Sequence, residues 1–181
     1  MKHLAAVLAA AAAVALAPSA HAQTSGSLGL GVGVVKPKDI DSTVWFTGTL
    51  RLPLSANLAL EPEIGYWKKT AEEGAAKASL EDLHFGGSAL LVFPSERVEI
   101  FVGGGAGAHR LKGKLGVFGV GIDRTETKLG LHILGGIDIR ASDSLTVFGA
   151  ARWERIRLGD EDDGDDDLDT TKFYGGLRFR L

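Results

Sequence analysis

The sequence predicts an all-β protein: a single antiparallel up-and-down barrel of eight strands that crosses a membrane. Three observations lead to this prediction. Apolar and polar residues alternate at every second position in eight segments, and the connections between these segments are alternately long and short. Glycine supplies 25 of the 181 residues, roughly twice its usual share. Because neighbouring side chains of a strand point to opposite faces, the alternation predicts strands with one apolar and one polar face.

Each predicted strand shows the same two-residue period. In the first, Leu28 and Leu30 alternate with glycines, and in the sixth, Leu131 and Ile133 flank His132. The last segment, TTKFYGGLRFRL, keeps bulky apolar side chains on one face and arginines on the other. The predicted strands cover residues 27–35, 43–54, 58–67, 83–93, 98–110, 125–140, 145–155 and 170–181.

The connections predict how these strands are joined. Short ones at residues 55–57, 94–97 and 141–144 alternate with long ones at 36–42, 68–79, 111–124 and 158–170. This alternation is typical of an antiparallel meander with tight turns at one end and long loops at the other. We therefore expect four long loops on the same side of the barrel.

Alternation alone fits either a soluble lipocalin-like barrel with an apolar lumen or a membrane barrel with an apolar exterior. The lumen of eight strands is only just wide enough for side chains, and the bulky apolar residues of every strand would overfill it. Glycines such as Gly65, Gly105 and Gly130 lie on the polar face, where they leave room for charged side chains. We therefore predict a plugged lumen with an ion-pair network formed by Arg51, Glu61, Glu63, Asp82, Lys128, Asp138, Arg140, Arg152, Glu154, Arg178 and Arg180.

The amino-terminal segment predicts export. Residues 1–22 contain a short basic start, an apolar stretch and the sequence Ala-His-Ala, which is typical of a cleaved signal peptide. The mature chain, residues 23–181, would carry 19 basic against 23 acidic residues and no cysteine. Such a charge balance does not favour a nucleic-acid partner.

An acidic run in the last long connection is the most prominent feature outside the predicted barrel. Carboxylate oxygens are the ligands that Ca²⁺ and Mg²⁺ prefer, so the run is a candidate cation loop. The EF-hand pattern does not fit it, because Gly159 and Thr170 would stand at ligand positions. The alternative is a solvated, self-repelling loop tip. The candidate ligands are Asp160, Glu161, Asp162, Asp163, Asp165, Asp166, Asp167 and Asp169.

The histidines do not form a catalytic motif in the sequence. Ser88 follows His84 by four residues on the same strand face, about 13 Å away at the strand rise, which is too far for a hydrogen bond. We expect His84 and His132 to bond to lumen carboxylates, and we predict no catalytic residues.

Four aromatic residues lie near predicted strand ends, where they suit either an interfacial girdle or core packing: Trp45, Tyr66, Trp67 and Trp153.

The pattern resembles the small outer-membrane β-barrel family of Gram-negative bacteria, the OmpA/OmpX-like barrels. The final YGGLRFRL is similar to that family's carboxy-terminal assembly signal at Tyr174, Gly176, Phe179 and Leu181, although the family usually ends in Phe. The glycine-rich FVGGGAGAHR is similar to the family's fifth strand. This resemblance implies location in the outer membrane and insertion by the β-barrel assembly machinery.

These observations predict a non-enzymatic, monomeric outer-membrane barrel with a structural or surface-interaction role carried by its loops. The expected partners are outer-membrane lipid and lipopolysaccharide, and no cofactor is expected beyond Ca²⁺ or Mg²⁺ at the acidic loop. Two alternatives remain open, a narrow channel for ions or small solutes and a lipid-modifying barrel enzyme.

Overall fold

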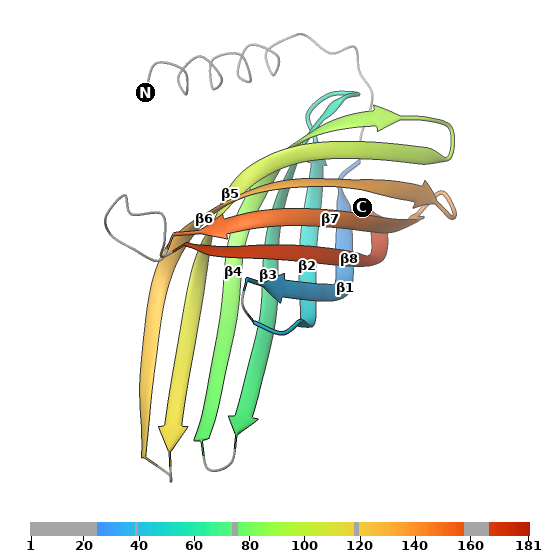
Figure 1. Ribbon diagram of the computed structural model, residues 1–181. Helices are drawn as coiled ribbons and strands as arrows, with labels where there is room; N and C mark the ends of the chain where they lie inside the picture. Colours follow the sequence, from blue (N-terminus) through green and yellow to red (C-terminus); the bar gives the residue numbers. More distant parts are fainter. Residues whose placement is uncertain (1–24, 39, 74–75, 118–119, 158–166) are drawn as a thin grey trace, which may run out of the picture.

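The computed structural model describes residues 25–38, 40–73, 76–117, 120–157 and 167–181. In these residues eight strands form one closed antiparallel barrel in the order β1 to β8 (Figure 1). The expected signal peptide, residues 1–22, lies outside the described residues. Within the described part of the chain, no helix is long and apolar enough to cross a membrane. The strands are β1 (Ser27–Pro37), β2 (Thr43–Pro53), β3 (Leu58–Glu73), β4 (Ala76–Pro94), β5 (Val98–Val117), β6 (Val120–Arg140), β7 (Leu145–Ile156) and β8 (Leu168–Arg180).

The ring closes between the first and last strands, which confirms the predicted fold class. β1 pairs with β8 in a register that places Leu28 opposite Phe179 and Leu30 opposite Leu177. All remaining pairs join strands that are consecutive in the chain, as in an up-and-down meander. Within the ring, closure leaves no free sheet edge, which is what a sheet in lipid requires.

Apolar side chains cover the outside of the barrel and polar ones are buried inside it. On β6, Ile133 is 61 % exposed, whereas its neighbour His132 is 3 % exposed. Every strand has this arrangement, which is the opposite of a soluble protein with an apolar core. Exposed examples on other strands are Leu30, Phe46, Phe85 and Phe173. The distribution matches the membrane barrel rather than the soluble lipocalin-like alternative.

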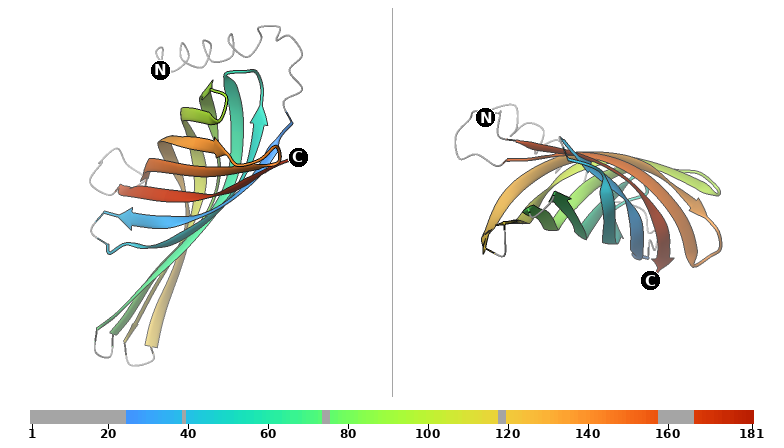
Figure 2. Two further views of the ribbon diagram at one scale, coloured as in Figure 1. Left: turned by 90° about the vertical axis from the view of Figure 1, so that its right-hand side faces the viewer. Right: turned by 60° about the horizontal axis from the view of Figure 1, so that its bottom comes forward.

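The strands differ in length, and four of them extend beyond the rest (Figures 1 and 2). β1, β2, β7 and β8 have 11 to 13 residues, whereas β3 to β6 have 16 to 21. The prediction of long loops at 68–79 and 111–124 was therefore wrong in part. Backbone pairing continues to Glu73 opposite Ala76 and to Val117 opposite Val120. Charged residues replace the apolar face there, so the hydrophobic pattern ends before the strands do.

Two apolar clusters inside the barrel lie among the polar side chains. One contains Val35, Trp45, Trp67, Phe148 and Tyr174, and the other contains Ala59, Leu90, Val92, Phe101 and Leu134. Trp45 and Trp67 are thus core residues, and a girdle position is wrong for both. Tyr66 and Trp153 are exposed on the outer face, where interfacial aromatics of membrane barrels lie.

Candidate functional site

Arg51 on β2 is the centre of a buried charge network near the short-turn end of the barrel. Its Nε lies 2.7 Å from Glu61 Oε2, and its Nη1 lies 2.7 Å from Asp138 Oδ2 and 2.9 Å from Glu99 Oε1. Arg178 Nη1 lies 2.9 Å from the same Glu61 oxygen. Arg51 and Arg178 also form the floor of a cavity of about 410 Å³ that is lined by residues of the short turns. At this level the lumen is thus crossed by mutually paired side chains from β2, β3, β6 and β8.

A second buried network lies further along the lumen. Arg152 on β7 donates from both terminal nitrogens to the two oxygens of Glu63 on β3. Lys172 Nζ on β8 lies 2.6 Å from Glu154 Oε2, and His84 Nε2 lies 2.6 Å from Glu63 Oε1. Each of these charges has an opposite charge in contact, which is the condition under which a buried charge is tolerated.

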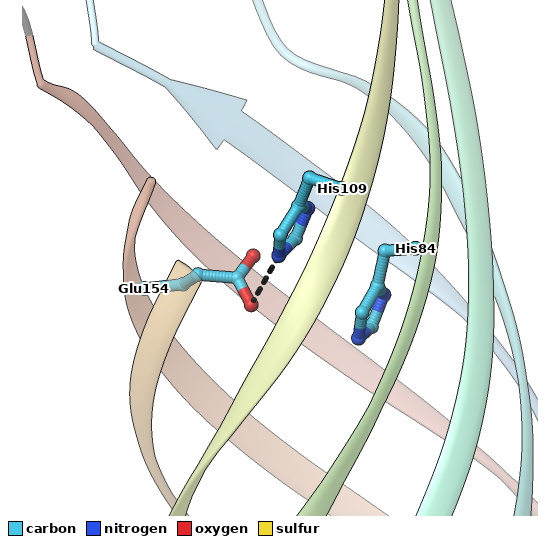
Figure 3. Close-up of side chains that lie close together, drawn as sticks. All are labelled: His84, His109 and Glu154. Carbon is cyan, nitrogen blue, oxygen red and sulfur yellow. Dashed lines mark ion pairs between the residues drawn. The ribbon is translucent and has the colours of Figure 1, made fainter. Parts of the chain in front are cut away.

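The three lumen histidines belong to this second network. His109 Nδ1 lies 3.0 Å from Asp82 Oδ2, which also accepts a hydrogen bond from Trp67 Nε1 at 3.1 Å. The other nitrogen of His109, Nε2, lies 3.4 Å from Glu154 Oε1, and the dashed line in Figure 3 marks this ion pair. The His84 ring stacks beside the His109 ring, with centroids 4.8 Å apart.

His132 contacts Ser88, for which the sequence offered no histidine partner once His84 on the same strand was judged too far away. Ser88 Oγ lies 2.7 Å from His132 Nε2, and His132 Nδ1 lies 3.7 Å from Glu154 Oε1. Ser88 and His132 lie on β4 and β6, in one row with Gly105 of β5 between them. Gly105 has no side chain, so the two can meet across it. The register of the two hairpins is the only signal that could have revealed the contact.

The Ser88, His132 and Glu154 side chains have the residue types of a hydrolytic triad, but they are enclosed. Ser88 is 4 % exposed and Glu154 is fully buried. A lipid ester would have to enter the filled lumen to reach the serine hydroxyl. The three side chains thus form part of the buried polar network.

Glycines make room for the imidazole rings. A Cβ added at Gly130 would lie 2.7 Å from His109 Nε2, and one added at Gly65 would lie 2.7 Å from His84 Nδ1. A Cβ at Gly105 would lie 2.8 Å from His132 Nε2. Each lumen histidine therefore occupies space that a glycine on a neighbouring strand leaves open.

Two residues expected in the lumen network lie elsewhere. Arg140 and Arg180 are exposed at the short-turn rim, because the strands that carry them end there. Lys128 lies opposite His109, partly buried at the edge of the network, and its Nζ is 3.5 Å from Glu126 Oε2. The sequence pattern gives the face on which a side chain lies but not its height along the barrel.

Two of the eight candidate ligands of the acidic loop are described, and both lie near a guanidinium group. Asp169 accepts hydrogen bonds from Arg155 at 2.8 and 3.1 Å, and Asp167 Oδ2 lies 3.8 Å from Arg155 Nε. Asp160, Glu161, Asp162, Asp163, Asp165 and Asp166 lie outside the described residues. The two described carboxylates of the loop are thus already paired with a cation of the protein, the Arg155 guanidinium.

The residues of the carboxy-terminal motif lie on both faces of β8. Tyr174 is buried against Trp45, with ring centroids 4.6 Å apart. Phe179 and Leu181 are exposed on the apolar side. Leu181 N donates a hydrogen bond to Gly26 O at 2.8 Å, next to the seam between β1 and β8.

The outer face of the long strands changes character above the apolar band. Successive cross-strand rows contain Tyr66, Leu83, Arg110 and Thr127, then Lys68, Glu81, Lys112 and Thr125, then Thr70, Ser79, Lys114 and Asp123. We call these three rows the outer hairpin face. It holds four basic and two acidic residues. Lys68 lies 3.9 Å from Glu81, and Lys114 lies 2.9 Å from Asp123.

Solved structures with the same fold include membrane barrels of several kinds. Neisserial surface protein A is 13 % identical, with a TM-score of 0.61, over 86 % of this chain and 97 % of that one. Ail of Yersinia pestis, solved in complex with the heparin analogue sucrose octasulfate, is 19 % identical, with a TM-score of 0.55 and the same coverage. The outer membrane enzyme PagL is 14 % identical, with a TM-score of 0.53, over 86 % of this chain and 99 % of that one.

Sequence comparison gives a more direct assignment. A search of curated proteins found no significant match. The family model described as "Outer membrane protein beta-barrel domain" matches residues 4–180. This match covers nearly the whole chain and agrees with the closed barrel, its apolar exterior and its polar lumen. The chain therefore belongs to the outer membrane protein β-barrel family, as its sequence pattern indicated.

Proposed function

We propose that this outer-membrane barrel is a non-enzymatic surface-interaction protein whose working part is the pair of long hairpins β3–β4 and β5–β6. The observation that carries the proposal is that these four strands stay paired well beyond the point where their outer face turns from apolar to charged. The strand lengths show how far this pairing continues. A membrane strand needs about 9–11 residues, whereas β5 has 20.

The extra length is enough to build a platform above the lipid. β3 continues for six residues past its last pair with β2, at Trp67, and β6 has ten residues before its first pair with β7, at Gly130. At about 3.3 Å each, these extend roughly 20–33 Å along the strands. Four adjacent strands extend in this way, so the projecting part is a paired sheet rather than two separate hairpins. A paired sheet can present a fixed array of side chains, as a binding surface requires.

The proposed ligand class is polyanionic, with the phosphate groups of lipopolysaccharide as the nearest source. Arg110 and Lys112 lie directly above the apolar band, at the level where lipid phosphates lie. Among the described residues, no carboxylate lies within ion-pair distance of either side chain. Basic groups at this level are attracted to an anionic surface by about 1 kcal/mol each. The sulfated ligand of the similarly folded Ail supports the same chemical class.

The two alternatives receive less support. A channel would need a continuous water path, but Arg51, Arg178, Glu63 and Arg152 pair across the lumen. Conductance in planar bilayers tests this directly, and we expect no stable open-pore current. An enzyme of the PagL kind would need an accessible nucleophile, whereas Ser88 is enclosed. A phospholipid or lipid A hydrolysis assay should detect no activity above that of an S88A variant.

The proposal also includes biogenesis and assembly state. Insertion by the β-barrel assembly machinery would use β8, with Tyr174, Gly176, Phe179 and Leu181 as the recognition residues. The barrel would act as a monomer, since closure of β1 on β8 completes the sheet within one chain. The surface role itself requires no cofactor.

The decisive experiment measures binding of purified, refolded barrel to lipopolysaccharide and to sucrose octasulfate. A variant with Arg110, Lys112 and Lys114 changed to Gln should bind lipopolysaccharide about 100-fold more weakly, because three contributions of about 1 kcal/mol are lost. Salt should weaken the wild-type binding, since exposed charges are screened. The matched control changes Arg97, Arg140 and Arg180, three exposed arginines at the short-turn rim. Equal loss in both variants, or none in the first, would contradict the proposal.

A further inference from the structure

We propose that the lumen binds a divalent transition-metal ion of the zinc class through His84, His109 and Glu154, with His132 within reach as a fourth ligand. The three side chains come from β4, β5 and β7 and lie close together inside the barrel. Figure 3 shows His109 against Glu154, with the His84 ring parallel to the His109 ring beside it. All three are buried. This inference is independent of the surface role proposed above.

The spacing of the donor atoms is close to what zinc requires. One ligand atom from each of the three residues lies within 4.8 Å of the others. Zinc binds nitrogen and oxygen at about 2.0–2.2 Å, so two ligands of one tetrahedral ion lie about 3.3–3.5 Å apart. His109 Nε2 and Glu154 Oε1 are already 3.4 Å apart. His84, whose Nε2 lies 2.6 Å from Glu63 Oε1, must shift toward the other two donors to complete three protein ligands.

A supporting shell orients the donors. His109 Nδ1 contacts the Asp82 carboxylate, and Asp82 is itself held by Trp67 Nε1. A proton on Nδ1 leaves the lone pair of Nε2 directed toward Glu154. Metal-binding histidines commonly have a carboxylate on the second nitrogen in this way. Ser88 plays the corresponding part for His132, because its contact with Nε2 leaves Nδ1 facing Glu154.

Several of these donor atoms have no hydrogen-bond partner among the described residues. Glu154 Oε1, His109 Nε2 and His132 Nδ1 are all buried and form no hydrogen bond, although the two nitrogens lie 3.4 and 3.7 Å from that oxygen. Leaving such atoms unsatisfied in a buried site is costly. A cation between them would satisfy all three, since each can supply a lone pair.

The charge of the surrounding network permits a cation. With neutral imidazoles, the network contains three carboxylates, Glu63, Asp82 and Glu154, and two cations, Arg152 and Lys172. Lys172 binds Oε2 of Glu154 and so leaves Oε1 to face the histidines. Arg152 is 3.9 Å from Oε1 but directs both of its terminal nitrogens to Glu63. The net negative charge thus lies on the side of the histidines.

The ligand types select the metal class. Two imidazoles and one carboxylate form a set that zinc accepts, whereas Ca²⁺ and Mg²⁺ prefer oxygen ligands alone. An ion held in this way would link β4, β5 and β7 across the lumen. Its binding free energy would add to the stability of the folded barrel, because the ligands are apart in the unfolded chain.

The test is the zinc content of the full chain refolded in detergent with ZnCl₂ and excess CaCl₂, then freed of unbound metal by gel filtration. Mass spectrometry of the metal should find about one zinc ion per folded chain. H109N and E154Q should lose it. E61Q is the matched control, since Glu61 is an equally buried carboxylate in the other network, and it should retain zinc. D82N should bind zinc about 10- to 100-fold more weakly, because it removes the orienting carboxylate.

Folding of each variant is checked by the mobility difference between unboiled and boiled samples. A second measurement needs only the wild type: Co²⁺ loaded in place of zinc should give the visible absorption of four-coordinate nitrogen and oxygen ligation. Folded wild-type barrel without zinc, or equal zinc content in the wild type and E154Q, would overturn the proposal. Zinc lost to excess calcium would also overturn it, because that result would place the ion on surface carboxylates.

Discussion

Glu63 and Arg152 face each other across the full width of the barrel. They lie on β3 and β7, four positions apart in a ring of eight strands, and both terminal nitrogens of Arg152 donate to the two oxygens of Glu63. The pair therefore connects opposite walls of the cylinder. Such a paired contact fixes the orientation of both side chains, because the guanidinium and the carboxylate are both planar.

Removal of one member of this pair should destabilise the barrel strongly. Arg152→Met leaves the Glu63 carboxylate buried without its guanidinium, and we expect a loss of about 3–5 kcal/mol in the free energy of unfolding. Urea unfolding of barrels inserted into lipid vesicles measures the change. The double variant Glu63→Leu with Arg152→Met should recover most of the loss, since no unpaired charge remains. A double variant as unstable as the sum of the single ones would show that the two residues act separately.

The outer face should tolerate charge near its edge but not at its centre. Ile133 and Ile139 both point outward on β6, and Ile139 lies next to the short-turn end of the strand. We expect Ile133→Arg to cost about 2–4 kcal/mol and Ile139→Arg about 0–1 kcal/mol, because the cost depends on depth in the bilayer. The same unfolding assay compares them. Equal costs would mean that β6 does not cross the membrane at this depth.

Gly130 should resist replacement by alanine because His109 lies against it. The added Cβ would lie 2.7 Å from His109 Nε2, and we expect Gly130→Ala to cost about 1–3 kcal/mol through overpacking. Gly149 is the control, because a Cβ there meets no atom within 4 Å. Gly149→Ala should be neutral or stabilise the strand by about 0.5–1 kcal/mol. If the unfolding midpoints fell equally in both variants, the space beside Gly130 would not be needed to hold the His109 ring.

The acidic connection gives a separate prediction about calcium. If the carboxylates between Asp160 and Asp166 bridge to lipopolysaccharide through divalent cations, changing them to Asn and Ser should abolish the effect of Ca²⁺ on surface binding. Changing Asp167 and Asp169 alone should have little effect, because Arg155 already contacts both. Binding titrations with Ca²⁺ or with EDTA measure the difference. If the first variant responded to Ca²⁺ as the wild type does, the acidic connection would be a solvated loop that binds no cation.

The sequence was sufficient for the barrel and for the face on which each side chain lies. Alternation around Leu131, His132 and Ile133 requires no tertiary information, and it correctly placed the apolar face outside. The extent of β3 to β6 could not be predicted in the same way. Above the membrane the outer face of these strands is polar, and the apolar residues that remain, such as Leu80 and Leu111, do not alternate with an apolar outer face that would define the length or register of the strands.

The internal contacts were less predictable because they depend on closure. The partner of Arg152 lies on the opposite wall, so only the completed ring brings it close to Glu63. The Ser88 and His132 contact requires the register of two hairpins and the missing side chain of Gly105 between them. The positions of Trp45 and Trp67 were also left open by the sequence. Their parity placed them on the lumen side, but their position near strand ends also suited a girdle.

The orientation of the barrel is the claim on which the surface role depends, and cysteine labelling on intact cells tests it most directly. The chain contains no cysteine, so Thr125→Cys on the long hairpins and Ser142→Cys in a short turn each give a single exposed thiol. A membrane-impermeant maleimide should label Thr125→Cys on whole cells and Ser142→Cys only after the outer membrane is permeabilised. Labelling of Ser142→Cys on intact cells, with Thr125→Cys protected, would place the hairpins inside the cell envelope and contradict the account.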